Sequence, residues 1–186
     1  MKKYELTTNT KMLFGRKLFQ IKALVSFGDV TAGDLGGYIE KEENLSHDGT
    51  AWVSGDARVS GNAWVSGDAL VSGDALVYGN ALVYGNARVY GDARVYGNAR
   101  VSGNALVYGN ADYICFKGFG SENRNTTMFR TKNGDVYVRC GCFTGSLKKF
   151  TEKVKETHGN SKYAKEYLAC VEVAKIHFEI GEENDK

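Results

Sequence analysis

The sequence predicts a mainly β protein built around a three-sided parallel β-helix. Residues 51–110 consist of ten consecutive copies of one pattern, Ala-x-Val-x-Gly-Asx, without a break. Each copy ends in Gly-Asp or Gly-Asn, a pair that tolerates the positive φ angles of a tight corner. Three such corners close one coil, and short sequence periods of this kind are typical of β-solenoids.

Within each copy the alanine and the valine lie two residues apart, so both point to the same side of an extended segment. The pattern runs from Ala51 and Val53 to Ala105 and Val107. It predicts a core of small and β-branched side chains. Ten copies make about three and a third coils, stacked roughly 4.8 Å apart.

Residues 1–32 are expected to cap the open end of this column. One segment alternates apolar residues on a single face: Phe19, Ile21, Ala23 and Val25. A strand there would pair with backbone groups that an open end leaves exposed.

Residues 33–50 continue the six-residue frame less regularly, so the predicted β-helix spans 33–111. The frame places Leu35 in a valine position and Gly37 in a glycine position. Lys41 and His47 fall in inward positions, and we expect both side chains to turn outward.

Residues 112–145 leave the repeat and predict a strand followed by a β-hairpin. The strand covers 112–119, and the hairpin covers 128–143 with Asn133-Gly134 as its turn.

Residues 146–180 predict two helices. The first ends at Gly159, and the second begins at the N-cap residue Ser161. We expect the acidic tail of residues 181–186 to fray.

The repeat resembles the left-handed β-helix family, whose hexads carry a large aliphatic residue and, four positions later, a small one. Val53 followed by Ala57 fits this rule, and so does every pair up to Val107 and Ala111. The resemblance implies left-handed winding and a trimeric state. The chain departs from the family in having no proline.

The layout on both sides of the repeat resembles hexapeptide-repeat proteins of phages and prophages of gut bacteria. The segments that carry this resemblance are LVSFGDVTAGDLGGYIEKEENLS before the repeat and VRCGCFTGSLKKFTEKVKETHGNSKYAKEYL after it. The resemblance implies a viral context and brings no site residues with it.

Composition narrows the function classes. The net charge of +2 gives no global field for nonspecific nucleic-acid binding. The sequence shows no secretion signal and no apolar run of about 20 residues that would span a membrane. We therefore expect a cytoplasmic protein, in the host cytoplasm if a phage encodes it, with reduced cysteines.

An acyltransferase is the main enzymatic alternative, because left-handed β-helices often host acyl transfer with a histidine base. The histidines are His47, His158 and His177, and all three lie outside the ten regular hexads. Only His47 is a plausible base, and an exposed residue in an irregular first coil is the simpler interpretation. We predict no catalytic residues and no cofactor.

Two metal sites were weighed, and neither is predicted. Cys140 and Cys142 would place two thiols on one strand face, with Cys115 or His158 completing a zinc site. Buried structural thiols are the better interpretation. A possible cation ladder stacks three turn carboxylates one coil apart: Asp56, Asp74 and Asp92.

The outward positions of the repeat are more informative. Several carry large apolar side chains, which a solitary soluble solenoid avoids. They predict a homo-oligomer interface, with a trimer favoured: Trp52, Trp64, Leu70 and Leu82.

Three consecutive hexads place one arginine on each side of a single coil, with tyrosines beside them. Arginine beside tyrosine is a good anchor for a protein hot spot or for phosphate plus base. The candidate partner-binding residues are Arg88, Arg94, Arg100, Tyr84, Tyr90 and Tyr96. The competing interpretation is that these residues only stabilise and solubilise the surface.

These observations favour a non-enzymatic phage protein that inhibits a host defence system. It would bind a host protein or sequester a nucleotide-type signal. An acyltransferase-like enzyme that uses His47 and a purely structural β-solenoid remain as alternatives.

Overall fold

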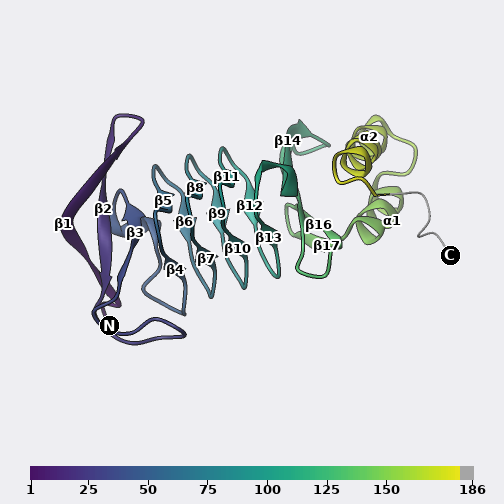
Figure 1. Cartoon of the computed structure of the whole chain (residues 1–186). Helices are drawn as coiled ribbons and strands as arrows, with labels where there is room; N and C mark the ends of the chain where they lie inside the picture. Colours follow the sequence, from purple (N-terminus) through teal and green to yellow (C-terminus); the bar gives the residue numbers. More distant parts are fainter. Residues whose placement is uncertain (181–186) are drawn as a thin grey trace. The chain divides into compact units, whose positions relative to one another are not determined.

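The computed structural model describes residues 1–180, so the expected fraying of residues 181–186 lies outside the described part. The chain divides into two compact units, the first comprising Met1–Asn110 and the second beginning at Ala111. Figure 1 shows the order of the elements along the chain.

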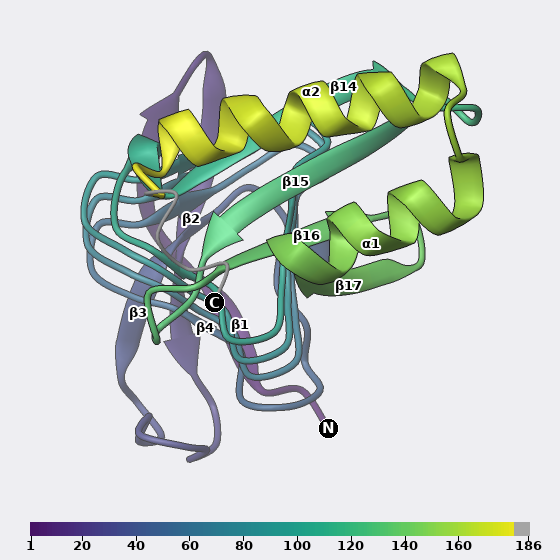
Figure 2. The ribbon, with the colours of Figure 1, turned by 90° about the vertical axis from the view of Figure 1, so that its right-hand side faces the viewer.

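The first unit contains a three-sided parallel β-solenoid, which confirms the predicted fold class. Its coils stack in Figure 1 and superimpose in the end-on view of Figure 2. Ten two-residue strands recur every six residues: β4 (Trp52–Val53), β5 (Arg58–Val59), β6 (Trp64–Val65), β7 (Leu70–Val71), β8 (Leu76–Val77), β9 (Leu82–Val83), β10 (Arg88–Val89), β11 (Arg94–Val95), β12 (Arg100–Val101) and β13 (Leu106–Val107).

Strands 18 residues apart pair in parallel, so three sheets form the three sides. One sheet contains β5, β8 and β11, the second β6, β9 and β12, and the third β4, β7, β10 and β13. The pairing of Val53 with Val71, and of Val71 with Val89, shows the 18-residue coil directly.

The core is the one that the repeat predicts. Every valine from Val53 to Val107 is fully buried, and every alanine from Ala51 to Ala105 is at most 1% exposed. The corners require glycine: Gly73 has a φ of 70°, and a Cβ atom there would lie 3.0 Å from the backbone nitrogen of Gly91 in the next coil.

The first coil differs from the prediction because its register is shifted. Ile39 pairs with Val59 and Leu45 with Val65, a spacing of 20 residues. The expected 18-residue spacing resumes at Trp52. Two extra residues therefore lie in the corner between Ser46 and Trp52.

This shift overturns the predicted places of Leu35 and Gly37. Leu35 is 60% exposed, and Ile39 occupies the inward valine position instead. A Cβ atom at Gly37 would meet Val53 and the carbonyl oxygen of Ala57, so Gly37 occupies the alanine position rather than a corner.

The N-terminal cap is present and contains one strand more than the segment identified from the sequence. Strand β1 (Tyr4–Leu13) pairs antiparallel with β2 (Arg16–Ala23), and β2 pairs antiparallel with β3 (Leu35–Ile39). Strand β3 continues in parallel to β5, so the cap extends one side of the solenoid. A 3₁₀ helix, η1 (Glu42–Asn44), follows β3.

The alternation expected along β2 is interrupted. The register between β2 and β3 shifts between Gln20 and Lys22. Leu18 is therefore fully buried, whereas Phe19 is partly exposed. Leu18 packs with Leu13, Tyr38 and Leu76, so the hairpin covers the outer side of β3 and β8.

The second unit is an antiparallel sheet with two helices. After η2 (Asn110–Asp112), the strands are β14 (Tyr113–Phe119), β15 (Arg124–Arg130), β16 (Val136–Cys140) and β17 (Phe143–Ser146), paired in that order. The predicted turn at Asn133-Gly134 joins β15 and β16, and Gly134 has a φ of 84°.

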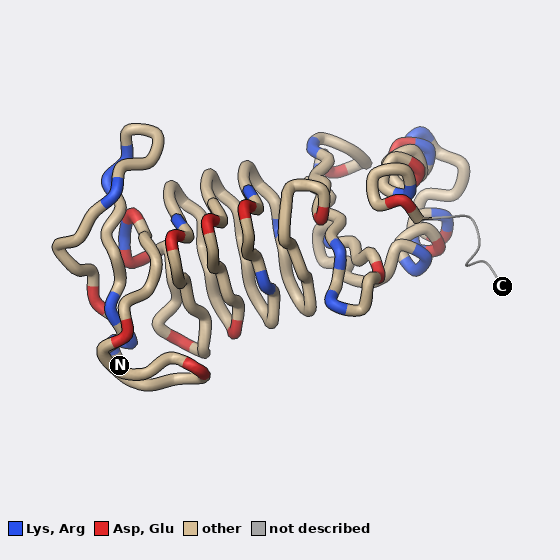
Figure 3. The backbone as a smooth tube through the Cα atoms, viewed as in Figure 1, with Lys and Arg blue, Asp and Glu red and all other residues tan. Residues whose placement is uncertain are grey.

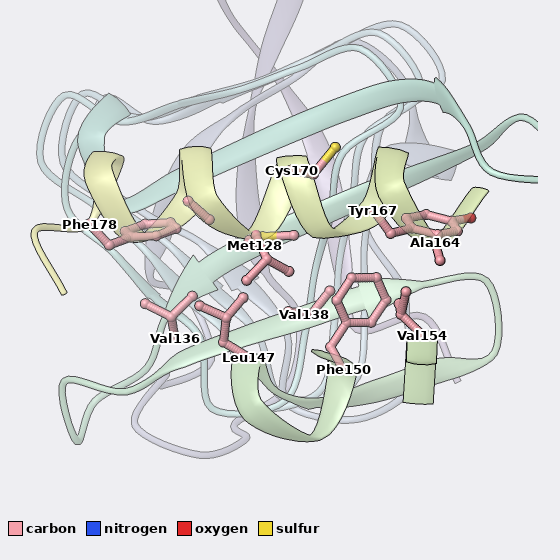
Figure 4. Close-up of a cluster of buried hydrophobic side chains, with 12 residues drawn as sticks. Met128, Val136, Val138, Leu147, Phe150, Val154, Ala164, Tyr167, Cys170 and Phe178 are labelled. Atoms are coloured by element: carbon pink, nitrogen blue, oxygen red, sulfur yellow. The ribbon is translucent and has the colours of Figure 1, made fainter. Parts of the chain in front are cut away.

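Helices α1 (Leu147–His158) and α2 (Lys162–His177) lie on one face of this sheet, as Figure 2 shows. Ser146 and Ser161 cap them, and Gly159 ends α1 as predicted. Figure 4 shows the core between them, which includes Met128, Phe150 and Phe178. Neither helix is long and apolar enough to cross a membrane.

Candidate functional site

The three predicted arginines point away from the solenoid core on three different sheets. Arg88 lies on β10, Arg94 on β11 and Arg100 on β12, and all three are exposed. Because the three sides of a coil face in different directions, these guanidinium groups do not converge on one pocket. Each contributes to a separate face.

The predicted tyrosines are separated in the same way. Tyr84 and Tyr90 are partly buried, and Tyr96 is 52% exposed. Tyrosines come together only one coil apart. Tyr78 and Tyr96 stack with ring centroids 5.3 Å apart and an interplanar angle of 10°. Tyr90 meets Tyr108 in the same way, one coil on.

One predicted interface residue is covered by its own chain. Trp52 is only 4% exposed, because the rings of Tyr4 and Phe27 lie 6.4 and 5.4 Å from it. The N-terminal segment thus supplies the cover that was assigned to a second subunit. Trp64 is 45% exposed, and Leu70 and Leu82 are partly exposed.

The structure also contains a cleft that sequence reasoning missed. A cleft of about 310 Å³ lies between the end of the β1–β2 hairpin and one corner of the solenoid. Phe14, Arg16 and Tyr78 line one part of it. Its other lining residues include Glu40, Lys41, Asn62 and Asn80.

An ion pair closes part of this cleft. Nη1 of Arg16 donates to both carboxylate oxygens of Glu40, at 2.9 and 3.0 Å. The backbone N–H of Gly61 also donates to Glu40, at 2.6 Å. Partial burial opposes ionisation of Glu40, but these hydrogen bonds outweigh it and hold its pKa below the usual value. The cleft therefore contains a fixed carboxylate beside a fixed guanidinium.

A ladder of amides forms the solenoid corner at the cleft. The side-chain nitrogen of Asn62 donates to Oδ1 of Asn80 at 3.2 Å, and that of Asn80 donates to Oδ1 of Asn98 at 3.1 Å. Each asparagine follows a corner glycine, so the coil spacing places equivalent amides in hydrogen-bonding range. This rigid ladder orients the polar wall of the cleft.

The hairpin end is unusual for its apolar exposure. Met12 is 65% exposed and Phe14 is 70% exposed. The two turn residues have positive φ angles, 47° at Phe14 and 76° at Gly15. The sequence signal was the glycine between Leu13 and Arg16, but a turn normally carries Asn or Asp before that glycine. Phenylalanine there hid the hairpin.

His47, the only plausible catalytic base, lies in the N-terminal cap. Its Nδ1 accepts a hydrogen bond from the backbone N–H of Lys3 at 3.1 Å, and its ring stacks on Tyr4 with centroids 4.4 Å apart. Its Nε2 lies 3.8 Å from Glu42. It does not turn fully outward as expected. These contacts give His47 a packing role within the cap.

The two thiols of Cys140 and Cys142 do not share a strand face, contrary to expectation. Strand β16 ends at Cys140, and Cys142 lies exposed in the turn before β17. Oγ1 of Thr126 donates to Sγ of Cys140 at 3.1 Å. Across residues 1–180, no three or more His, Cys, Asp or Glu side chains gather as a metal site would require.

The stacked corner carboxylates instead meet cations of the chain itself. Asp56 pairs with Lys11 at 2.6 Å, and Asp74 lies 3.9 Å from Arg58.

Comparison with known families agrees with the coiled structure. The family model described as the YdcK β-solenoid repeat matches residues 51–67, 69–85, 77–91, 81–97, 87–101 and 99–111. No curated protein matches the chain significantly. The chain therefore carries a β-solenoid repeat, and residues 51–111 are similar to the YdcK β-solenoid repeat family.

Proposed function

We propose that the chain is a non-enzymatic binding protein that displays side chains on a rigid β-solenoid. The supporting observation is a contrast within the repeat. The inward positions hold alanine and valine in all ten hexads, whereas the outward positions change between tryptophan, leucine, arginine, serine and tyrosine. A constant core with a varied exterior is what a display scaffold requires, and a filament built only for stiffness has no need of it.

A protein is the preferred partner. Arg88, Arg94 and Arg100 lie on three flat sides rather than around one cavity, which suits a protein surface better than a nucleotide. Arginine and tyrosine are the residues most often found at interface hot spots. A nucleotide-type signal remains the second candidate, because the same side chains can bind phosphate and base.

The finer proposal is that a phage encodes this protein to inhibit a host defence system from within the host cytoplasm. The viral context rests on the resemblance of the layout to phage and prophage proteins. Blocking a defence protein is a task that binding alone can perform.

The proposal includes a homo-oligomer, with a trimer favoured. Trp64 and Leu82 lie one coil apart on the β6–β9–β12 side and leave apolar surface exposed. Light scattering on the purified chain would give the mass directly. A monomer that becomes no larger at high concentration would refute the oligomer.

The functional test uses bacteria that each carry one antiphage defence system. The chain is co-expressed, and phage plating is compared with and without it. Restored plating on at least one strain is expected. Three matched variants, Arg88→Glu, Arg94→Glu and Arg100→Glu, each change one side of the same coil. At least one should lose activity while keeping the wild-type melting temperature.

Two results would overturn the proposal. If no defence system is inhibited, the inhibitor role is wrong. If all three arginine variants retain full activity, the coil that they occupy is not the binding surface. His47→Ala separates the enzyme alternative, because an acyltransferase that uses this base would lose its activity and a binding protein would not.

A further inference from the structure

The end of the β1–β2 hairpin carries a residue that the turn itself disfavours. Phe14 has a φ of 47°, in the left-handed region where a bulky side chain is strained by about 1 kcal/mol. Asparagine or aspartate would relieve this strain at the same position. Strain that local structure does not require is a reason to look for a function of the side chain.

Packing within the chain does not account for this phenylalanine. Its ring meets one aromatic neighbour, Tyr78, at a centroid distance of 5.7 Å, and it remains 70% exposed. Met12, on the same hairpin end, is 65% exposed. Two large apolar side chains thus stand together in solvent on a rigid projection.

Cations flank this apolar end. Lys11, Arg16 and Lys17 surround it in the sequence, and Figure 3 shows Lys and Arg gathered just below the uncharged end of the hairpin. Arg16 is held in place by Glu40, and Lys11 by Asp56. Lys41 is exposed at the adjoining cleft. The surface therefore combines an apolar centre with positioned positive groups at its edge.

We propose that residues 12–16 and the adjoining cleft form a docking site for an acidic segment of a partner protein. An apolar side chain of that segment packs against Met12 and Phe14, and its carboxylates face Arg16 and Lys41. The amide ladder at Asn62 and Asn80 offers hydrogen bonds to its backbone or side chains. The proposal rests on the proposed binding function and names the chemistry of the partner.

Charge favours a protein segment over the other occupants. Glu40 lines the same cleft, and Asp56 accompanies Lys11, so the carboxylates nearby would repel a continuous phosphate backbone. An anionic membrane attracts clusters of about four to eight cations, more than are positioned here. A second copy of this chain would have to bring its own acidic segment.

The test places a photoreactive benzoyl-phenylalanine at position 14 of the full chain. Cross-linking is carried out in the bacteria used for the plating assay. The same amino acid at position 35 is the control, because Leu35 is also an exposed apolar residue of the first unit. The expected result is a cross-link from position 14 to one host protein, within a segment that carries carboxylates next to an apolar residue.

Two variants then test the chemistry. Phe14→Asn keeps the turn and removes the ring, so the melting temperature should stay the same or rise while recovery of that host protein falls at least tenfold. Arg16→Glu should cause a similar loss. Leu35→Asn, the matched control, should change recovery less than twofold.

The outcomes separate this inference from the proposed function. A cross-link to a lipid, a nucleic acid, a second copy of this chain or a segment without carboxylates overturns the docking site. So does the absence of a cross-link in cells where the chain inhibits a defence system, although the binding function then stands. A cross-link to an acidic segment without any inhibition supports the docking site and refutes the inhibitor role.

Discussion

The corner glycines of the solenoid allow the strain of a left-handed backbone to be separated from the tight stacking of coils. Gly73 and Gly103 have φ angles of 70° and 65°, so alanine is strained at both. A Cβ atom at Gly73 would lie 3.0 Å from both the nitrogen and the oxygen of Gly91, whereas one at Gly103 would meet nothing within 4 Å. The two substitutions differ in stacking alone.

The expected magnitudes follow from these distances. Gly103→Ala should lower the free energy of unfolding by about 1–2 kcal/mol, the cost of alanine in the left-handed region. Gly73→Ala adds the cost of forcing two coils apart, which resembles overpacking of a core at about 1–3 kcal/mol. Gly73→Ala should therefore be the more destabilising by that second amount.

Urea unfolding followed by tryptophan fluorescence would measure both. The two tryptophans of the chain, Trp52 and Trp64, both lie in the first unit, so the signal reports the solenoid. Equal losses for the two variants would refute the stacking argument. No loss for Gly103→Ala would refute the strain argument.

Three further predictions concern the cap and the amide ladder. Burial outweighs the attraction of nearby aspartates and lowers the pKa of Lys3 from 10.5 to about 8, so the unfolded chain binds more protons between these values. The free energy of unfolding should rise by about 2 kcal/mol from pH 8 to 9.5, as urea titrations would show, and Lys3→Met should remove this slope. Asn80→Asp cannot donate to Asn98 and should cost about 0.5–1.5 kcal/mol, read from the urea midpoint. His47→Ala should lower the melting temperature by a few degrees, because it removes the stacking on Tyr4 and the acceptor for the Lys3 N–H, but phage plating should be unchanged; an unaltered melting temperature would contradict the packing role.

The regular coils could be predicted from the sequence residue by residue. Each hexad presents the same inward pair, such as Ala69 and Val71, and the same corner, so one period determines strand, face and turn together. The first coil could not be predicted in this way. Two additional residues between Ser46 and Trp52 shift its register, and only the hydrogen bonding of Ile39 to the next coil reveals it.

The candidate surfaces were harder to predict because exposure depends on distant parts of the chain. The repeat places Trp52 outward, but it cannot show that Tyr4 and Phe27 cover it. Likewise, Phe14 and Asn62 are far apart in sequence and meet only because the hairpin folds beside a corner. Periodicity describes the solenoid and says nothing about what lies against it.

The 18-residue coil also determines which changes in length the chain can tolerate. An insertion of three hexads would lengthen the column by about 4.8 Å and leave every later side chain on its original side. An insertion of one hexad would keep the core equally well packed but rotate all later positions by a third of a turn. Gene duplication can therefore lengthen this scaffold cheaply only in units of 18 residues, and a single added hexad would reassign every displayed residue after it to a different side.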